Sequence, residues 1–310
     1  MSIPDHWMRH LPNGKSISAL GFGCSSVWAK ASFDEALAQE VLQVALDEGV
    51  NYFDTSPSYG LGVGEERLSR FLSQTNLSTL VVSTKVGSNL VDGRVERGFG
   101  CDMIKRSFDE SLKRLKLDHV DILYLHGPAQ EDLNDGVLKF FEMEKIAGRI
   151  SYSGVNSFDH NVLMHVAASP IDAAMIQYNV ADFRLKNAMQ ALHQNGKIVI
   201  SGTALARAQF DLKTFLPRDF KSLWYLARMA RQDLGFALRG RRLAKVLSKL
   251  GTSPYEVAIK FVTSQREILS NLFGSTDPRH VRANIQAAKQ MLAPSLNSEM
   301  EAVLRKVALT

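Results

Sequence analysis

Four polar side chains of different chemical types stand where short apolar runs of the sequence end. Asp54 ends NYFD, Lys85 ends LVVSTK and His126 ends VDILYLH, while Tyr59 follows Asp54 closely in TSPSYG. Any one of them alone is more simply explained as a turn residue, a solvated residue or a core residue. Their recurrence at three consecutive apolar runs predicts instead that they share one site.

An aspartate, a tyrosine, a lysine and a histidine can together supply the proton for reduction of a carbonyl group. Addition of a hydride to the carbonyl carbon leaves negative charge on the oxygen, which needs a proton donor. A tyrosine hydroxyl has an ordinary pKa of about 10, and a nearby lysine ammonium favours the tyrosinate and so lowers that pKa. A buried aspartate keeps the lysine charged, and a histidine orients the substrate oxygen and shares the proton. The four groups would also stabilise an oxyanion.

Short apolar strands alternate with longer helical segments along the chain, and this alternation decides where the four side chains meet. Parallel strands joined by crossover helices define an α/β fold. A longer helical region at 223–250 is interpreted as an insertion, and a last helix is expected at 299–307. Strands are expected at 17–22, 52–54, 80–85, 120–126, 150–156, 174–178, 197–201 and 272–274.

The expected fold is a (β/α)8 TIM barrel with a short N-terminal β-hairpin, turning at Asn13-Gly14, and extra C-terminal helices. The competing α/β form is an open Rossmann sheet, but the first strand leads into GFGCSSVW and not into a G-x-G-x-x-G motif. No linker or low-complexity segment divides the chain, so residues 1–310 are interpreted as one domain. In a barrel the carboxyl ends of the strands meet at one mouth, which would gather the four polar residues.

The composition is that of a globular protein and argues against several classes of partner. The chain has 310 residues and a net charge of +5, with basic residues mostly interleaved with acidic ones. The basic stretch 228–249 is interpreted as a solvated face beside an anionic ligand, since no nucleic-acid-binding module is recognisable. No signal peptide and no membrane-spanning run is found. Neither nucleic acid nor a membrane is therefore expected as a partner.

Cysteine usage bears on the redox compartment and on metal binding. The chain has two cysteines, Cys24 and Cys101. Neither belongs to a CxxC pair or to a His/Cys spacing that binds metal, so no metal is expected. Both are expected to be reduced thiols, which favours a cytoplasmic location.

The segments around these residues resemble the aldo-keto reductase superfamily. GVNYFDTSPSYGLGVGEERLSRFL is similar to the first signature of that family, and LVVSTKVG and ESLKRLKLDHVDILYLHGP continue it in order at the right spacing. The resemblance covers residues 15–290 approximately. It implies a catalytic tetrad of Asp54, Tyr59, Lys85 and His126. Tyr59 would be the general acid or base, Lys85 and Asp54 would tune it, and His126 would orient the substrate.

The resemblance also implies a nicotinamide cofactor. In GRISYSGVNSF and IQYN, the carboxamide would be held by Asn156 or Ser157 and by Gln177. In VISGTALARAQF, Ser201 and Gly202 stand where many relatives place an aromatic residue that stacks on the nicotinamide. The residues that would approach the pyrophosphate through backbone N–H groups are Thr203, Leu205 and Ala206.

The adenosine end of the cofactor would lie at the last β/α unit, LFGSTDPRHVRANIQA. Gly274, Ser275 and Thr276 precede a helix N-terminus, which attracts phosphate. Arg279, His280 or Arg282 could pair with a 2′-phosphate, and Asn284 would contact adenine. Because solvated arginines on a helix face are the alternative explanation, NADP(H) is favoured over NAD(H), which stays possible.

The substrate side of the site is less defined by the sequence. The resemblance implies that Trp28 lines the pocket and that Gly127 replaces a bulky residue of many relatives. Two mouth loops are expected, at 88–101 and 207–241. Arg94, Arg97 and the basic stretch 228–249 hint at an anionic substrate, with plain surface charge as the alternative.

The leading hypothesis is NADPH-dependent reduction of an aldehyde, ketone or sugar carbonyl, with Tyr59 as general acid. An NAD-dependent sugar or alcohol dehydrogenase working oxidatively is the nearest alternative, because the same site serves both directions. Another is a slow-turnover NADPH-sensing binding protein resembling the potassium-channel β subunits of the superfamily. The expected partner is a small carbonyl or alcohol substrate, and the oligomeric state is left open.

Overall fold

The computed structural model describes residues 6–205 and 253–290 of the chain. Some of the sequence predictions fall elsewhere. Ala206, the loop at 207–241, the helical region at 223–250 with its basic stretch, and the helix at 299–307 lie outside the described residues.

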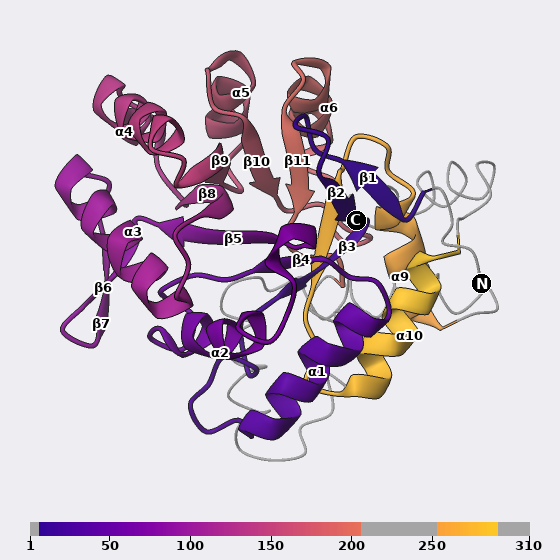
Figure 1. The fold of residues 1–310 in the computed structure, drawn as a ribbon. Helices are drawn as coiled ribbons and strands as arrows, with labels where there is room; N and C mark the ends of the chain where they lie inside the picture. Colours follow the sequence, from indigo (N-terminus) through magenta and orange to yellow (C-terminus); the bar gives the residue numbers. More distant parts are fainter. Residues whose placement is uncertain (1–5, 206–252, 291–310) are drawn as a thin grey trace, which may run out of the picture.

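Eight parallel strands close into a barrel at the centre of the fold (Figure 1). Neighbouring strands follow one another along the chain, and the last strand pairs with the first. The predicted (β/α)8 barrel is therefore confirmed. Its strands are β3 (Leu20–Gly23), β4 (Tyr52–Asp54), β5 (Val81–Val86), β8 (Val120–His126), β9 (Ile150–Asn156), β10 (Ala173–Ile176), β11 (Ile198–Ser201) and β12 (Ser270–Phe273).

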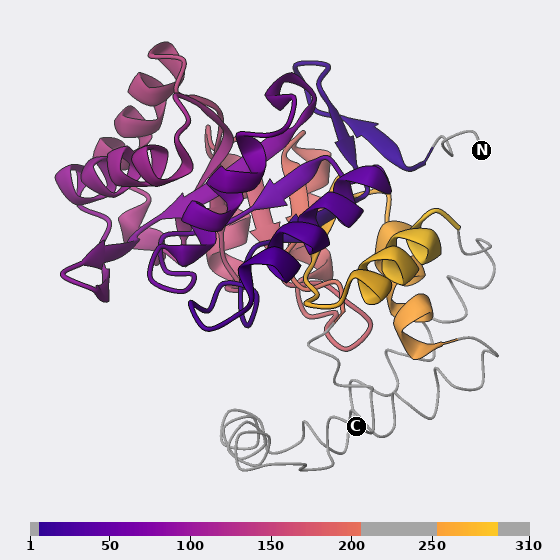
Figure 2. The same ribbon diagram turned by 60° about the horizontal axis from the view of Figure 1, so that its bottom comes forward.

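Helices lie on the outside of the barrel, as Figures 1 and 2 show from two directions. Each presents an apolar stripe to the strands, as Ile104, Phe108 and Leu112 do in α3, where the sequence predicts that stripe. The helices of the described residues are α1 (Glu35–Asp47), α2 (Val63–Leu72), α3 (Cys101–Leu115), α4 (Asp135–Ile146), α5 (His160–Ala168), α6 (Lys186–Gln194), α9 (Pro254–Thr263) and α10 (Pro278–Ala288), with short 3-10 helices η1 (Leu77–Thr79) and η2 (Gln130–Asp132).

The core has two parts because successive side chains of a strand point to opposite faces. In β8, Ile122 and Tyr124 belong to the cluster inside the barrel, whereas Leu123 and Leu125 belong to the cluster between strands and helices. The inner cluster fills the barrel below the mouth. Polar side chains at the upper ends of the strands therefore stand above a packed floor, not at the entrance of a channel.

An N-terminal hairpin covers the other end of the barrel. Its strands are β1 (Met8–His10) and β2 (Ser16–Ser18), and Gly14 in the connecting turn has φ +84°, so the predicted Asn13-Gly14 turn is confirmed. Leu11 and Ile17 pack into the inner cluster. The strand expected at 17–22 is divided between β2 and β3, because the chain passes from the hairpin into the barrel there.

A second hairpin rises at the mouth where the sequence predicted a loop at 88–101. Strands β6 (Ser88–Val91) and β7 (Arg94–Arg97) pair antiparallel. Asp92 and Gly93 both have positive φ, 47° and 73°, which is the backbone of a tight two-residue hairpin turn. The Asp-Gly pair was the available signal for this hairpin: the segment lies at the mouth as predicted, but its two strands were not predicted.

Candidate active site

Three neighbouring strands of the barrel carry three of the four predicted side chains to one place. Asp54 is the last residue of β4, Lys85 lies near the end of β5, and His126 is the last residue of β8. Strand β5 pairs with both of the others. Tyr59 reaches the same place from the turn that connects β4 to α2.

Asp54 and Lys85 form a buried ion pair. The ammonium Nζ lies 2.6 and 2.5 Å from the two carboxylate oxygens and also donates to the carbonyl oxygen of Thr55 at 2.9 Å. Their side chains are only 3% and 1% exposed, so neither charge could persist there without the other. Burial favours the neutral amine, but Asp54 and Tyr59 outweigh it and raise the pKa of Lys85, which keeps the ammonium charged.

The carboxylate has a further partner that sequence analysis did not single out. Burial raises the pKa of Asp54, and Lys85 and Ser83 oppose that rise. The Ser83 hydroxyl donates to Oδ1 of Asp54 at 2.7 Å, and it lies 2.9 Å from the Tyr52 hydroxyl. Because Ser83 uses its hydrogen on the carboxylate, Tyr52 must donate to Ser83. Ser83 was available to strand periodicity, since it lies two residues before Lys85 and on the same face.

Tyr59 lies between the ion pair and the pocket. Its ring centroid is 5.0 Å from Nζ of Lys85 and 6.1 Å from the His126 imidazole, which meets it edge-on at 87°. Burial raises the pKa of the Tyr59 phenol, and Lys85 lowers it by a smaller amount. The predicted influence of the lysine is present, but the net direction is upward. The phenol therefore keeps its proton at neutral pH and can donate it.

His126 is neutral in this environment. Burial, reinforced by the charges of Lys85 and Arg97, lowers the pKa of its imidazole to about 3. Nδ1 lies 3.4 Å from the hydroxyl of Ser56, another residue that sequence analysis did not single out. When Ser56 donates to Nδ1, the hydrogen of the ring is on Nε2, which can then donate to a substrate oxygen.

A pocket of about 500 Å³ opens above these groups and extends from Tyr59 and His126 to the N-terminus of α10. Its floor and walls come from the carboxyl ends of several strands and from the loops that follow them. The lining residues are Gly23, Ser25, Ser26, Val27, Trp28, Asp54, Tyr59, His126, Asn156, Phe158, Met175, Gly202, Thr203, Ala204, Leu205, Leu272, Phe273, Gly274, Ser275 and Thr276.

Six of the predicted cofactor residues line this pocket: Asn156, Thr203, Leu205, Gly274, Ser275 and Thr276. Two of the lining glycines lie close to each other in the wall. An added Cβ at Gly274 would lie 3.3 Å from the Gly23 carbonyl oxygen, so the two backbones leave little room for a side chain there. A pocket lined both by a proton donor and by the residues just before a helix N-terminus fits a dinucleotide with a reactive ring and a phosphate-bearing end.

Three other predicted cofactor residues do not line the pocket. Ser157 is buried just after the end of β9, and its hydroxyl accepts from the backbone N–H of Asp159 at 3.2 Å. Gln177 donates to Asp182 at 2.8 Å. Asn284 is buried on α10. The sequence leaves Asn156 and Ser157 as alternatives, and the geometry favours Asn156 because it lines the pocket.

The basic residues of α10 lie at its exposed beginning. Arg279 pairs with Asp277 at 2.7 Å, and Asp277 is also the N-cap of the helix. Arg282 pairs with Glu48 at 3.0 Å, and His280 is exposed. None of the three lines the pocket, although Thr276, close before them in the chain, does.

Apolar side chains also line the pocket. Trp28 lines it as predicted, with only 2% of its surface exposed. Val27 and Phe158 line it too and are about half exposed, at 50% and 48%, and sequence analysis missed both. Gly127 is not a lining residue. It has φ +71°, and Arg97 of β7 donates to its carbonyl oxygen at 2.7 Å.

Within residues 6–205 and 253–290, no group of histidine, cysteine and acidic side chains is arranged to hold a metal ion. The same residues contain no helix long and apolar enough to span a membrane. Cys24 is buried and Cys101 exposed, and each is a free thiol.

Comparisons with known proteins identify a family and a matching fold. The sequence model of the Aldo/keto reductase family matches residues 19–305. L-galactose dehydrogenase of Arabidopsis thaliana is 29% identical over 97% of this chain and 95% of its own length. A Schizosaccharomyces pombe protein named aldo-keto reductase yakc [NADP(+)] is 25% identical over 97% of this chain and 91% of its own. The holo structure of aldo-keto reductase AKR11C1 from Bacillus halodurans superposes with a TM-score of 0.78, at 24% identity, over 97% of this chain and 96% of that one.

Proposed function

The chain belongs to the aldo/keto reductase family, and from this premise we propose that it reduces an aldehyde, ketone or sugar carbonyl with NADPH, using Tyr59 as the general acid. Members of this family are oxidoreductases that use nicotinamide cofactors. The observation that carries this proposal is the position of Tyr59, whose ring centroid lies 5.0 Å from Nζ of Lys85 in the buried Lys85–Asp54 pair and which lines the pocket together with His126.

The four side chains have separate tasks in this proposal. Nε2 of His126 donates a hydrogen bond to the substrate carbonyl oxygen and fixes its orientation. As negative charge develops on that oxygen, the Tyr59 hydroxyl transfers its proton to it. The ammonium of Lys85 stabilises the tyrosinate that remains, and Asp54 holds Lys85 in place and charged. In the oxidative direction the same tyrosinate would accept the proton of the alcohol.

The residues that line the pocket fit a nicotinamide cofactor. When bound, the cofactor would supply the hydride for the carbonyl carbon. Asn156 would hold the carboxamide, Thr203 would lie at the pyrophosphate, and the backbone of Gly274, Ser275 and Thr276 would receive phosphate at the N-terminus of α10. Gly202 leaves the wall open where an aromatic side chain could otherwise stand.

NADPH is proposed over NADH because Arg279 and His280 are exposed at the beginning of α10, next to the phosphate end of the pocket. One relative carries NADP(+) in its name, which agrees with this preference. Asp277 acts against it, because its carboxylate already pairs with Arg279 and would repel a 2′-phosphate.

That ion pair favours one alternative. If Arg279 stays paired with Asp277 when the cofactor binds, the protein would prefer NAD and would work as a sugar or alcohol dehydrogenase. One relative is named L-galactose dehydrogenase. A polyhydroxylated substrate suits both the reductase and the dehydrogenase, since Ser25 and Ser26 add hydroxyl groups to the pocket wall. Slow turnover by an NADPH-sensing protein would need the same site and differs only in rate.

Titration of the purified protein with NADPH and, separately, NADH tests the cofactor proposal. Trp28 lines the pocket, so binding is expected to quench tryptophan fluorescence. Tighter binding of NADPH, followed by its oxidation in a screen of aldehydes, ketones and aldoses, is the expected result. Tighter binding of NADH, together with oxidation of sugars, would favour the dehydrogenase. Tight binding of NADPH without turnover would favour the sensing protein. Binding of neither would overturn the cofactor proposal.

A further inference from the structure

One wall of the pocket is built by a loop without a sheet partner. The β3–α1 loop, residues 24–34, contributes Ser25, Ser26, Val27 and Trp28 to the lining. Such a segment has few backbone ladder bonds of its own, so its carbonyl groups need other donors to be fixed in one position.

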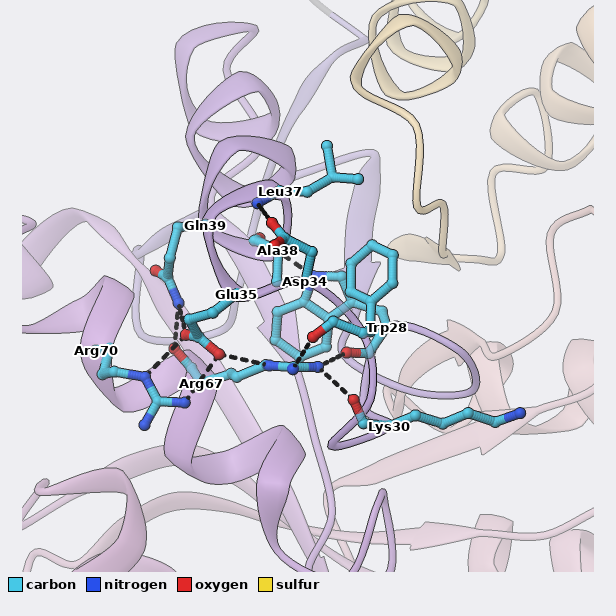
Figure 3. A network of polar contacts seen from close by, with 10 residues as sticks. Trp28, Lys30, Asp34, Glu35, Leu37, Ala38, Gln39, Arg67 and Arg70 are labelled. Carbon is cyan, nitrogen blue, oxygen red and sulfur yellow. Dashed lines mark hydrogen bonds and ion pairs between the residues drawn. The ribbon is translucent and has the colours of Figure 1, made fainter.

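Arg67 supplies these donors from α2, the helix that follows the Tyr59 turn. Its side chain is buried, and Figure 3 shows its guanidinium inserted among the carbonyl groups of the loop. It donates to the carbonyl oxygens of Trp28, of Lys30 at 2.9 Å and of Phe33 at 2.5 Å. One planar, buried cation thus holds three backbone positions of the loop at once.

The same guanidinium also contacts the rings of the loop. It lies 5.9 Å from the Trp28 ring centroid and 5.8 Å from that of Phe33. Trp28 is fixed at its other side by Nε1, which donates to the Ala38 carbonyl oxygen at 3.2 Å. The position of the indole in the pocket wall therefore depends on Arg67 and on the start of α1.

The loop also packs against the turn that carries Tyr59. Gly60, the next residue, approaches the loop so closely that an added Cβ would lie 1.8 Å from the Ala29 carbonyl oxygen. Ala29 lies between Trp28 and Lys30, both held by Arg67. A displacement of the loop would therefore move the wall at Trp28 first and reach the Tyr59 turn through Gly60.

We propose that Arg67 is a positioning residue that determines substrate selectivity by fixing the β3–α1 loop as the wall of the pocket. Arg67 touches neither substrate nor cofactor and acts through Trp28 and Val27. The inference rests on the proposed carbonyl reduction, because selectivity needs a reaction. Its structural part, the fixing of the loop, is independent of the reaction.

Arg70 provides a matched control. It lies one turn further along α2 and pairs with the same carboxylate, because Nε of Arg67 and Nε of Arg70 each lie 2.8 Å from an oxygen of Glu35 (Figure 3). Its side chain is 49% exposed, and its bonds go to Glu35 alone. Arg70→Met thus removes an arginine from the same network without releasing the loop.

The first measurement needs no substrate. Trypsin under native conditions cleaves after exposed lysines in segments that open, and Lys30 is an exposed lysine in the β3–α1 loop. Arg67→Met is expected to speed cleavage after Lys30 by about tenfold or more, with cleavage elsewhere unchanged. Arg70→Met is expected to resemble the wild type. Equal cleavage after Lys30 in all three proteins would overturn the fixing of the loop.

The second measurement compares a small and a bulky carbonyl substrate. In Arg67→Met, KM for the bulky substrate is expected to change about tenfold, with kcat within about threefold of wild type and NADPH affinity unchanged. A uniform fall in kcat for both substrates would mean a general structural role and overturn the selectivity proposal. Arg67→Lys keeps the charge but cannot reach three carbonyl groups. It replaces Arg67→Met in both measurements if Arg67→Met does not fold. If the wild type turns over no carbonyl, the proposed reaction fails, while the tryptic result still decides the loop.

Discussion

At the scale of single residues, the ion pair of Asp54 and Lys85 depends on a hydrogen-bond chain that enters the barrel core. Tyr52 donates to Ser83, and Ser83 donates to Asp54. Each donor stabilises the charged carboxylate, and hydrogen bonds to charged groups contribute more than those between neutral ones. These hydrogen bonds thus oppose the rise that burial causes in the pKa of Asp54.

Ser83→Ala should therefore destabilise the protein by about 1.5–3 kcal/mol at pH 7 and lower turnover, because the carboxylate loses its neutral donor. Tyr52→Phe, which leaves the Ser83–Asp54 bond intact, should cost less, about 1 kcal/mol. Denaturant unfolding of both variants measures the difference. A larger loss of unfolding free energy for Tyr52→Phe than for Ser83→Ala would contradict the assignment of Tyr52 as donor to Ser83 and of Ser83 as donor to Asp54.

The neutral state of His126 makes a prediction about pH. Its folded pKa of about 3 lies below the ordinary value of 6.5, so below pH 6.5 the unfolded chain binds a proton that the native protein does not. This residue should therefore reduce the free energy of unfolding as the pH falls from 6.5 towards 3, by about 1.4 kcal/mol for each pH unit.

His126→Gln should remove that loss. Between pH 7.5 and pH 5.5 the variant is expected to lose about 1.4 kcal/mol less stability than the wild type. His160→Gln, which replaces an exposed histidine at the start of α5, is the control. Identical pH dependence of His126→Gln and the wild type would mean that the imidazole is not held neutral.

At the scale of elements, the Tyr59 turn depends on a glycine. Gly60 has φ +63° and faces the Ala29 carbonyl oxygen, whereas Gly14 has φ +84° in the N-terminal hairpin with no atom near an added Cβ. Gly14→Ala should cost only the left-handed backbone penalty, about 1–2 kcal/mol. Gly60→Ala should cost clearly more and lower kcat, because the turn must move away from Ala29. Equal costs in thermal unfolding would contradict the close packing of the turn.

Three strands lie where sequence analysis placed them. The bounds of β4, β8 and β9 agree with the prediction at both ends, because a helical segment or a glycine turn limits each of them on either side. The hairpin of β6 and β7 was missed because its strands are short and mostly polar and give no hydrophobic period, and because β7 is exposed along its whole length. Its Asp-Gly turn was the one local signal.

The site was predictable where a strand end dictates the position of a side chain. Asp54, Lys85 and His126 come together because β4, β5 and β8 are neighbours in the barrel. Phe158 and Arg67 were not found, since their contacts with the pocket or its wall arise from loops whose paths no periodicity describes. Gln177 and Asn284 are the opposite case. The resemblance to the family predicted that they contact the cofactor, but neither residue lines the pocket.

At the scale of the whole molecule, a ligand that binds only the folded protein raises its stability by mass action. At one hundred times its Kd, NADPH should add about 2.7 kcal/mol to the free energy of unfolding and raise the Tm by several degrees. The same concentration of NADH should give a smaller shift if the beginning of α10 receives a 2′-phosphate. Equal shifts would remove Arg279 and His280 from the proposed cofactor site.

Hydride transfer from NADPH deuterated at both C4 positions of the nicotinamide, to a carbonyl that the wild type reduces, tests the central claim most directly. The product should gain one deuterium on the former carbonyl carbon. Tyr59→Phe should bind NADPH normally but reduce the carbonyl at a rate about 10²–10⁴-fold below that of the wild type. Tyr152→Phe, at the hairpin end of the barrel, should keep the rate of the wild type. Turnover of Tyr59→Phe close to the wild type, or a product without deuterium, would contradict the account.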